Sequence, residues 1–328
     1  MLVTGANGSG KTNLLEALHL GTQGFSPRVR GDVQLIRFGA DAARVTLRGS
    51  NDARRFEADV TLRRDEPRKA LLNGDVLRSA EQLRGLFHTL VFTPDRLAVV
   101  KGGPATRRAY LDRSTGRLFP GRAVAASEYA SALGQRNAAL RRISLGLSSG
   151  DALTPWTERV AATGAELVAT RRATIEALAP AFGELAERLG LDAATLAYEE
   201  EAPTVAALDG RLARDLERGF TSLGPHLHDL RIAAGGRDLR TYGSQGEQRT
   251  AVLALVLAEA TALTARSGAA PLVLLDDVLS ELDPGRRLAL ARLLESPGQT
   301  LITATTSDAL PIDPALALVV DGGQVRRA

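Results

Sequence analysis

The stretch that decides the fold is Gly5-Ala6-Asn7-Gly8-Ser9-Gly10-Lys11-Thr12, which fits the pattern GxxxxGK[ST] of a phosphate-binding loop. Its glycines let backbone N–H groups curl around a phosphate with no Cβ in the way. The apolar pattern of residues 11–20 predicts a helix whose positive end faces the same anion. In such loops the lysine reaches the β- and γ-phosphates and the hydroxyl binds Mg²⁺. We therefore expect Lys11 and Thr12 to bind the phosphates and the Mg²⁺ of a nucleoside triphosphate.

A second element, Leu272-Val273-Leu274-Leu275-Asp276-Asp277, predicts a buried parallel strand that ends in two carboxylates. Asp276 is placed to hold Mg²⁺ through water. Asp277 is then the candidate to orient or deprotonate the attacking water. Taken alone, an acidic pair more often caps the next turn. Together with the phosphate loop, the pair favours the catalytic interpretation.

A third motif lies between these two and precedes a long apolar helix predicted at residues 245–266; it reads Tyr242-Gly243-Ser244-Gln245-Gly246-Glu247-Gln248-Arg249. Ser244 is a good N-cap, and Gly246 permits close approach to a phosphate. An ordinary helix start is the alternative. The order of the three motifs resembles that of ATP-binding-cassette (ABC) ATPases, whose signature serine and glycine occupy this place. Leu279-Ser280-Glu281-Leu282-Asp283 then resembles their D-loop.

The pattern of predicted elements defines the fold class. Short β-like runs from residue 32 to residue 72, beginning with 33–36, predict an antiparallel meander, and residues 103–191 read as helices. Alternating strands and helices return after residue 224 and predict a mainly parallel sheet. We expect an α/β protein, an ABC-type P-loop ATPase head with an antiparallel β subregion and an inserted α-helical lobe. The ATPase lobe would comprise residues 1–114 and 223–328, and the helical lobe residues 115–222. Further strands are expected at 88–92, 195–198, 230–233, 300–303 and 316–320, and further helices at 205–218 and 284–295.

Composition narrows the function. The 328 residues are 44% hydrophobic and 24% charged, which excludes wholesale disorder, and the lack of cysteine excludes a disulfide scaffold and a thiol nucleophile. Residues 1–120 contain 20 basic and 12 acidic side chains, a net charge of +8. This excess suits a polyphosphate or nucleic-acid partner, although solvated arginines would give it too. No apolar run approaches the roughly 20 residues of a membrane span, so we expect a cytoplasmic protein with no membrane partner.

Within the ABC superfamily the chain resembles the RecF family of DNA-repair ATPases, which are related to SMC-type heads. The similar blocks run through nearly the whole chain, and their order and spacing argue against chance. They are residues 91–97, 101–104, 107–112, 135–140, 164–166, 224–229, 244–249 and 274–283, with Trp156.

This resemblance implies weak, DNA-stimulated ATP hydrolysis coupled to recognition of gapped duplexes or single-strand/double-strand junctions, with the partners RecR, RecO and RecA. It also implies a head-to-tail homodimer formed on ATP, with each nucleotide between Lys11 of one subunit and Ser244 and Gly246 of the other. A γ-phosphate that holds both subunits is lost on hydrolysis, which would weaken the dimer.

The expected residues fall into three groups. The catalytic residues are Asp277, Lys11 and Ser244, and the Mg²⁺ ligands are Thr12 and Asp276. The ATP-binding residues are Gly5, Ala6, Asn7, Gly8, Ser9, Gly10, Lys11, Thr12, Asn13, Ser244, Gln245, Gly246 and Asp283.

Two motifs differ from the patterns of related families. The GPHRDD block of the RecF family reads Gly224-Pro225-His226-Leu227-His228-Asp229 here. Transport cassettes carry a histidine where this chain has Thr303-Ala304-Thr305-Thr306, so sensing of the γ-phosphate would need a hydroxyl or a different residue. His226 and His228 have the spacing of metal ligands, but the sequence shows no third ligand cluster, so a metal site is the less favoured interpretation.

Proteins of this fold carry strands before the phosphate loop, whereas only residues 1–4 precede it here, fewer than the usual five or six of a strand. We hypothesise that the chain is truncated or that its start was assigned late, which would reduce ATP affinity and the stability of the lobe.

Two other functions remain open. A transporter cassette predicts an LSGGQ signature and a switch histidine, both missing, together with a membrane partner. A non-hydrolysing DNA-binding scaffold is the second. Candidate DNA contacts, by clustering alone, are Arg28, Arg30, Arg54, Arg55, Arg63, Arg64 and Arg68.

Overall fold

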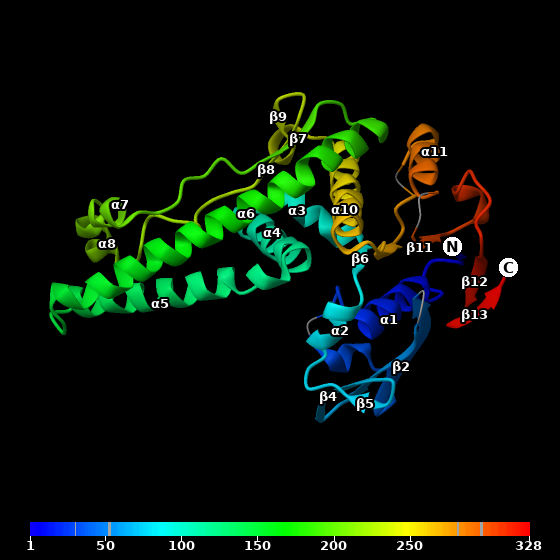
Figure 1. Ribbon diagram of the computed structural model, residues 1–328. Helices are drawn as coiled ribbons and strands as arrows, with labels where there is room; N and C mark the ends of the chain where they lie inside the picture. The colour runs from blue at the N-terminus through cyan, green and yellow to red at the C-terminus, as the bar shows by residue number, and fades with distance from the viewer. Residues whose placement is uncertain (30, 52–53, 281, 296–297) are drawn as a thin grey trace. The chain divides into compact units, whose positions relative to one another are not determined.

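The computed structural model (Figure 1) describes residues 1–29, 31–51, 54–280, 282–295 and 298–328. Its main sheet has six strands. The chain forms two compact units, residues 1–96 with 263–328 and residues 97–262. The strands of the first unit are β1 (Leu2–Thr4), β2 (Ala42–Asn51), β3 (Arg54–Arg63), β4 (Glu66–Leu72), β5 (Asp75–Val76), β6 (Thr89–Phe92), β10 (Leu272–Leu275), β11 (Thr300–Ala304), β12 (Ala317–Asp321) and β13 (Gln324–Arg327). Its helices are α1 (Lys11–Gln23), α2 (Glu81–Leu86) and α11 (Pro284–Leu293).

The strand order of the main sheet is β13-β12-β1-β11-β10-β6, and every neighbouring pair is parallel except β12 and β13. This confirms the mainly parallel sheet predicted from the alternation of strands and helices. β1 has three residues and lies between β11 and β12, where Val3 packs with Leu15 of α1. β11 pairs with both β1 and β10, so the loop after β1 and the acidic pair after β10 emerge at the same edge of the sheet.

A separate antiparallel sheet has the order β2-β3-β4-β5 and confirms the predicted meander for residues 42–72. The strand predicted at residues 33–36 was wrong, because Asp32–Leu35 is a 3₁₀ helix. Its conformation follows from tertiary contacts. Arg68 donates two hydrogen bonds to the carboxylate of Asp32, at 2.9 and 2.6 Å, and Ile36 packs into the core beneath β3.

The second unit is mostly helical, which agrees with the helices predicted for residues 103–191, and in Figure 1 its helices α5 (Ala125–Ser144) and α6 (Thr154–Arg188) run side by side. It also contains the helices α3 (Ala98–Lys101), α4 (Pro104–Leu118), α7 (Val205–Asp209), α8 (Leu212–Arg218), α9 (Leu239–Tyr242) and most of α10 (Gln245–Ser267). Its strands are β7 (Ala194–Ala197), β8 (Arg231–Ala234) and β9 (Arg237–Asp238). The continuous helix predicted at 205–218 was wrong, because the chain breaks at Gly210, whose helix propensity is low.

A fully buried ion pair joins α5 and α8 in the helical unit. Arg136 of α5 donates to Asp215 of α8 at 2.8 Å and to the hydroxyl of Thr221 at 2.7 Å. Asp215 also accepts hydrogen bonds from the backbone and the hydroxyl of Ser222. A buried charge left unpaired costs about 3–5 kcal/mol, so these contacts fix how α5 and α8 pack.

Helix α10 is, among the described residues, the one helix long and apolar enough to cross a membrane by length and composition. It is mostly buried inside the protein, and a charged residue lies in its middle: Glu259 is fully buried and pairs with Arg117 of α4. These contacts are those of a core helix.

Candidate nucleotide-binding site

A pocket of about 280 Å³ lies where the phosphate loop and the acidic pair meet. It belongs entirely to the first unit, and it brings together residues that are more than 250 positions apart in the sequence. Its lining residues are Asn7, Gly8, Gly10, Lys11, Thr12, Asn13, Arg28, Asp276, Asp277 and Thr303.

The phosphate loop has the backbone geometry that its glycines predict. Gly8 and Gly10 have φ angles of 80° and 111°, in the region that glycine occupies without strain. A Cβ on Gly5 would lie 2.3 Å from the carbonyl oxygen of Val320, so no larger residue fits there. The N–H of Gly323 donates to the carbonyl of Ser9 at 3.0 Å, so the turn between β12 and β13 supports the loop.

Lys11 opens helix α1 and is buried beneath the loop. Its Nζ donates to the carbonyl oxygens of Gly5 at 2.7 Å and Ala6 at 2.9 Å. An ammonium group has three protons, so two hold the loop and one remains for an anion. Helix α1 has no side-chain cap and no acidic residue in its first turn. Its first N–H groups therefore point at the pocket without a competing carboxylate.

The two residues expected to bind Mg²⁺ are in contact. The hydroxyl of Thr12 donates to Oδ1 of Asp276 at 3.1 Å, and Asp276 is only 6% exposed. A hydroxyl and a carboxylate oxygen beside a phosphate-binding loop are the hard oxygen donors that Mg²⁺ prefers. The side chains present thus fit this cation.

Thr303 connects the two members of the acidic pair, a role that the sequence did not predict; the sequence only placed it in the segment that stands where transport cassettes carry a histidine. Its hydroxyl donates to Oδ1 of Asp276 at 2.8 Å and accepts the backbone N–H of Asp277 at 2.9 Å. Asp277 has a φ of 49°, which is uncommon for a residue with a side chain, and the hydroxyl of Ser280 donates to its carbonyl at 3.0 Å. The sequence did carry a signal, because Thr303 is a polar residue inside an apolar strand.

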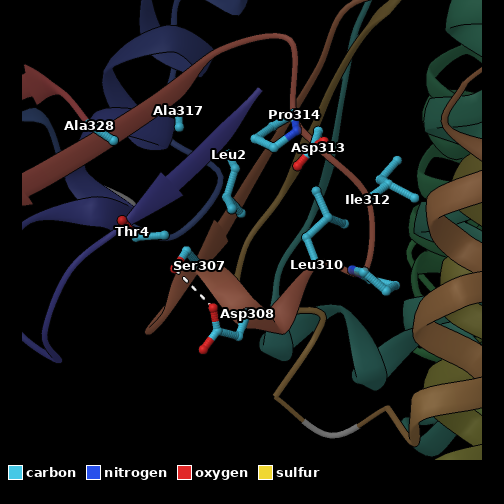
Figure 2. Close-up of a pocket in the computed structure, with 11 residues that line it drawn as sticks. Leu2, Thr4, Ser307, Asp308, Leu310, Ile312, Asp313, Pro314, Ala317 and Ala328 are labelled. Atoms are coloured by element: carbon cyan, nitrogen blue, oxygen red, sulfur yellow. Dashed lines mark hydrogen bonds between the residues drawn. The ribbon is translucent and has the colours of Figure 1, made fainter.

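A larger cavity of about 390 Å³ in the same unit lacks the side chains that a triphosphate needs (Figure 2). Its polar side chains include Asp313 and Ser307, whose hydroxyl donates to Asp308 at 3.3 Å. None of its lining residues is Lys, Arg or His. Carboxylates repel phosphate, so the smaller pocket with Lys11 and Arg28 is the candidate site.

The signature motif lies in the second unit at the start of α10, and its helix start has the predicted N-cap. The N–H of Glu247 donates to Oγ of Ser244 at 3.2 Å, and the N–H of Ser244 donates to the Glu247 carboxylate at 2.7 Å. This reciprocal pair is a capping box. Gln245 and Gly246 form the first turn of the helix.

Asp283, expected to contact the nucleotide, is the N-cap of α11. Its carboxylate accepts the backbone N–H of Arg286 at 3.0 Å, and this hydrogen bond lowers the pKa of Asp283. Glu281, in the same D-loop-like stretch, lies outside the described residues.

The two histidines of residues 224–229 are held by tyrosines. The hydroxyl of Tyr129 is 2.7 Å from Nδ1 of His226, and that of Tyr198 is 2.9 Å from Nδ1 of His228. Burial lowers the pKa of both imidazoles. The described residues contain no group of three or more metal-ligating side chains, so the geometry gives the histidine spacing a structural explanation.

Ion pairs and hydrogen bonds of arginines connect residues 224–229 to the helices α4 and α6 of the same unit. Arg107 of α4 donates to both carboxylate oxygens of Asp229, at 2.7 and 2.6 Å. Arg171 of α6 binds Asp112 in the same bidentate way and also donates to the carbonyl of Pro225. These contacts explain why residues 107–112 and 224–229 form one structural unit.

Several arginines proposed as DNA contacts have partners within the chain. Arg63 pairs with Glu66 at 2.9 Å, Arg68 pairs with Asp32, and Arg28 lines the candidate nucleotide pocket. Arg64 donates to the carbonyl of Ala40, and Arg55 is exposed. Arg30 and the side chain of Arg54 lie outside what the structure describes.

Known proteins with a similar sequence and fold define the class of protein to which this chain belongs. The family model described as the RecF/RecN/SMC N terminal domain matches residues 1–316. A solved SMC head domain from Pyrococcus furiosus superposes with a TM-score of 0.59 at 19% identity, covering 100% of this chain and 89% of that one. The fold is therefore that of an ABC-type ATPase head of the kind found in RecF and SMC proteins.

The particular family follows from nearer relatives. The chain is 41% identical over 336 residues to the DNA replication and repair protein RecF of Anaeromyxobacter sp. (strain K), covering 96% of this chain and 88% of that protein. The solved "Structure of the recombination mediator protein RecF-ATP in RecFOR pathway" superposes with a TM-score of 0.83 at 29% identity, covering 100% and 91% of the two chains. The chain belongs to the RecF family.

Proposed function

We propose that this protein is a DNA-repair ATPase that binds Mg²⁺–ATP in the pocket formed by the phosphate loop and the acidic pair. The observation that carries the proposal is the joining of Lys11, Thr12 and Asp276 in one pocket, through the loop carbonyls and the 3.1 Å contact between Thr12 and Asp276. The RecF relatives, one of them solved with ATP, support the same nucleotide.

Each side chain would act on a different part of the nucleotide. Lys11 and the N–H groups at the start of α1 would bind the β- and γ-phosphates, and Asn13 would lie beside them. Thr12 and Asp276 would hold Mg²⁺, which when bound neutralises phosphate charge. Asp277 would orient or deprotonate the water that attacks the γ-phosphate. Arg28, which lines the pocket, would add positive charge there.

The signature would act from a second copy of the chain. In a head-to-tail dimer, the start of α10 with Ser244, Gln245 and Gly246 would meet the nucleotide held by the partner, and Asp283 would lie near the same interface. The support is chemical, because a helix N-terminus with an exposed serine hydroxyl suits a phosphate oxygen. Loss of the γ-phosphate on hydrolysis would then weaken the dimer.

The nucleic-acid partner would be a gapped duplex or a single-strand/double-strand junction, and its binding would stimulate weak hydrolysis. RecR, with RecO and RecA in the same pathway, would be the protein partners, in the cytoplasm. The names of the relatives support a place in DNA repair, and the +8 charge of residues 1–120 suits phosphate contacts. Exposed arginines such as Arg55 are the better candidates, since Arg63 and Arg68 already bind carboxylates.

Phosphate release tests this function when measured with ATP alone, with intact duplex and with gapped duplex. We expect slow release that the gapped duplex stimulates most. DNA affinity, measured in the same buffers, should fall steeply as salt rises, because neutralised phosphates release counterions. ATP binding with no phosphate release under any of these conditions would favour the non-hydrolysing scaffold. Absence of ATP binding would refute the site.

A further inference from the structure

We propose that Thr303 is a positioning residue that fixes both aspartates of the acidic pair through a single hydroxyl group. This inference rests on the proposed function, since the acidic pair matters for turnover only if ATP is hydrolysed here. Thr303 is fully buried near the end of β11, in the run Thr300-Leu301-Ile302-Thr303-Ala304. A buried hydroxyl in an apolar strand needs partners, and its partners are the two aspartates.

The hydroxyl uses its donor and an acceptor on different residues. Its proton goes to Oδ1 of Asp276 at 2.8 Å, and a lone pair accepts the backbone N–H of Asp277 at 2.9 Å. A hydroxyl has one proton to donate and lone pairs that accept. Because the N–H of Asp277 can only donate, Thr303 accepts from it and gives its proton to the carboxylate of Asp276. One side chain on β11 thereby sets the spacing between the carboxylate of Asp276, directly after β10, and the backbone of Asp277.

The backbone of Asp277 shows why such a contact is needed. Its φ of 49° lies in the left-handed region, which residues with a Cβ seldom occupy. Two hydroxyls hold it there: Thr303 accepts its N–H, and Ser280 donates to its carbonyl at 3.0 Å. Without Thr303, the N–H of Asp277 loses its partner and the residue can relax toward an ordinary conformation that re-aims its carboxylate.

The carboxylate of Asp276 is shared between two threonines with different tasks. Oδ1 accepts from Thr303 and also from Thr12, one of the two proposed Mg²⁺ ligands. Thr303 is not one of the proposed Mg²⁺ ligands, so its bond to Asp276 would persist if Thr12 bound the cation. Loss of the Thr303 hydroxyl should therefore disturb both the cation requirement and the step that needs Asp277. Phosphate binding by Lys11 should be spared.

The decisive variant is Thr303→Val, which keeps the branched shape and removes the hydroxyl. We expect kcat to fall about 10- to 100-fold, because small misplacement of a catalytic group has effects of this size. The Mg²⁺ concentration for half-maximal rate should rise, whereas the affinity for ATP measured without Mg²⁺ should stay within about twofold. Thr303→Ser restores the hydroxyl and should restore most of kcat. Thr300→Val, on the same strand but outside the pocket, is the matched control.

The proposal is overturned if folded Thr303→Val, with a wild-type melting temperature, keeps the kcat and the Mg²⁺ requirement of the wild type. If Thr303→Val does not fold, Ser280→Ala gives a second test, because it removes the other hydroxyl on Asp277 from an exposed position. It should lower kcat and leave the Mg²⁺ requirement unchanged, and an unchanged kcat would contradict the proposal. A wild-type protein that binds ATP but releases no phosphate would instead refute the proposed hydrolysis.

Discussion

Helices α1 and α10 both begin beside glycine-containing motifs. They differ in whether a side chain already caps the start of the helix. Helix α1 starts after Gly10 with no side-chain cap and no acidic residue in its first turn. Helix α10 starts with Ser244 and Glu247, which satisfy each other's backbone N–H groups. The first helix thus offers unpaired N–H groups and a lysine to an anion, and the second already has a carboxylate in that place.

This difference suggests two modes of phosphate binding. The N-terminus of α1 is preorganised, with the loop held open by glycine geometry and by the contact of Gly323 with Ser9. The N-terminus of α10 would have to exchange the Glu247 carboxylate for a phosphate oxygen. Phosphate binding at the N-terminus of α1 should therefore be the stronger interaction. Phosphate binding at the N-terminus of α10 should occur only when the Glu247 carboxylate is displaced.

The largest effect on ATP affinity should come from Lys11→Met, which removes the charged group at the preorganised end. A charge-assisted hydrogen bond contributes about 1.5–3 kcal/mol, so ATP affinity should fall about 10- to 100-fold. Titration with a fluorescent ATP analogue measures it. A variant that binds and hydrolyses ATP like the wild type would place the nucleotide elsewhere.

Asp277→Asn should separate binding from turnover. The amide cannot take the proton of the attacking water, so kcat should fall about 100-fold or more, while ATP affinity and the ATP-dependent dimer are retained. Single-turnover phosphate release measures the first quantity and sedimentation the second. Normal turnover would remove Asp277 from the proposed role.

Glu247→Gln tests phosphate binding at the N-terminus of α10. Glutamine can still accept the N–H of Ser244, so the capping box survives and only the negative charge is lost. A charge at a helix N-terminus contributes about 0.3–1 kcal/mol, so dimerisation on ATP should tighten about two- to fivefold. Glu128→Gln, in the first turn of α5, is the matched control. Weaker dimerisation in Glu247→Gln would mean that the carboxylate assists engagement.

The smallest effect concerns Asp283, the N-cap of α11. Asp283→Ala removes the carboxylate that accepts the N–H of Arg286, so its melting temperature at neutral pH should be slightly below that of the wild type. The melting temperature of Asp283→Asn should fall less, because an amide oxygen can still accept this N–H. The pKa of Asp283 is lowered in the folded protein, so its contribution is present above the ordinary carboxyl range and is lost as the pH falls through the folded pKa. The difference between wild type and Asp283→Ala should therefore shrink in acid. A constant difference would assign the effect to packing.

Much of the fold was predictable because its signals are local. The loop glycines, the apolar run before Asp276 and the helical periodicity of residues 103–191 each define an element without knowledge of its neighbours. β13 was missed because all four of its residues are exposed and carry no alternating apolar pattern. The strand predicted at 33–36 failed because the contact of Arg68 with Asp32 decides that conformation from a distance.

The candidate site shows the same limit. Lys11, Thr12 and Asp276 could be placed together because their motifs have fixed positions on strands and helices. Thr303 and Arg28 could not, since each becomes part of the pocket only through pairing or loop geometry that joins distant segments. Clustering of arginines alone made Arg28 a candidate DNA contact, and its position in the pocket favours the nucleotide.

In the proposed dimer, each ATP lies between the α1 end of one subunit and the α10 end of another. Mixing two inactive variants tests it most directly. Lys11→Met keeps Ser244 but binds ATP only weakly, and Ser244→Arg binds ATP but cannot engage a partner's phosphate. Neither should release phosphate alone, and an equimolar mixture with gapped duplex should recover activity, because mixed dimers contain one complete site. A mixture as inactive as its components would contradict the account.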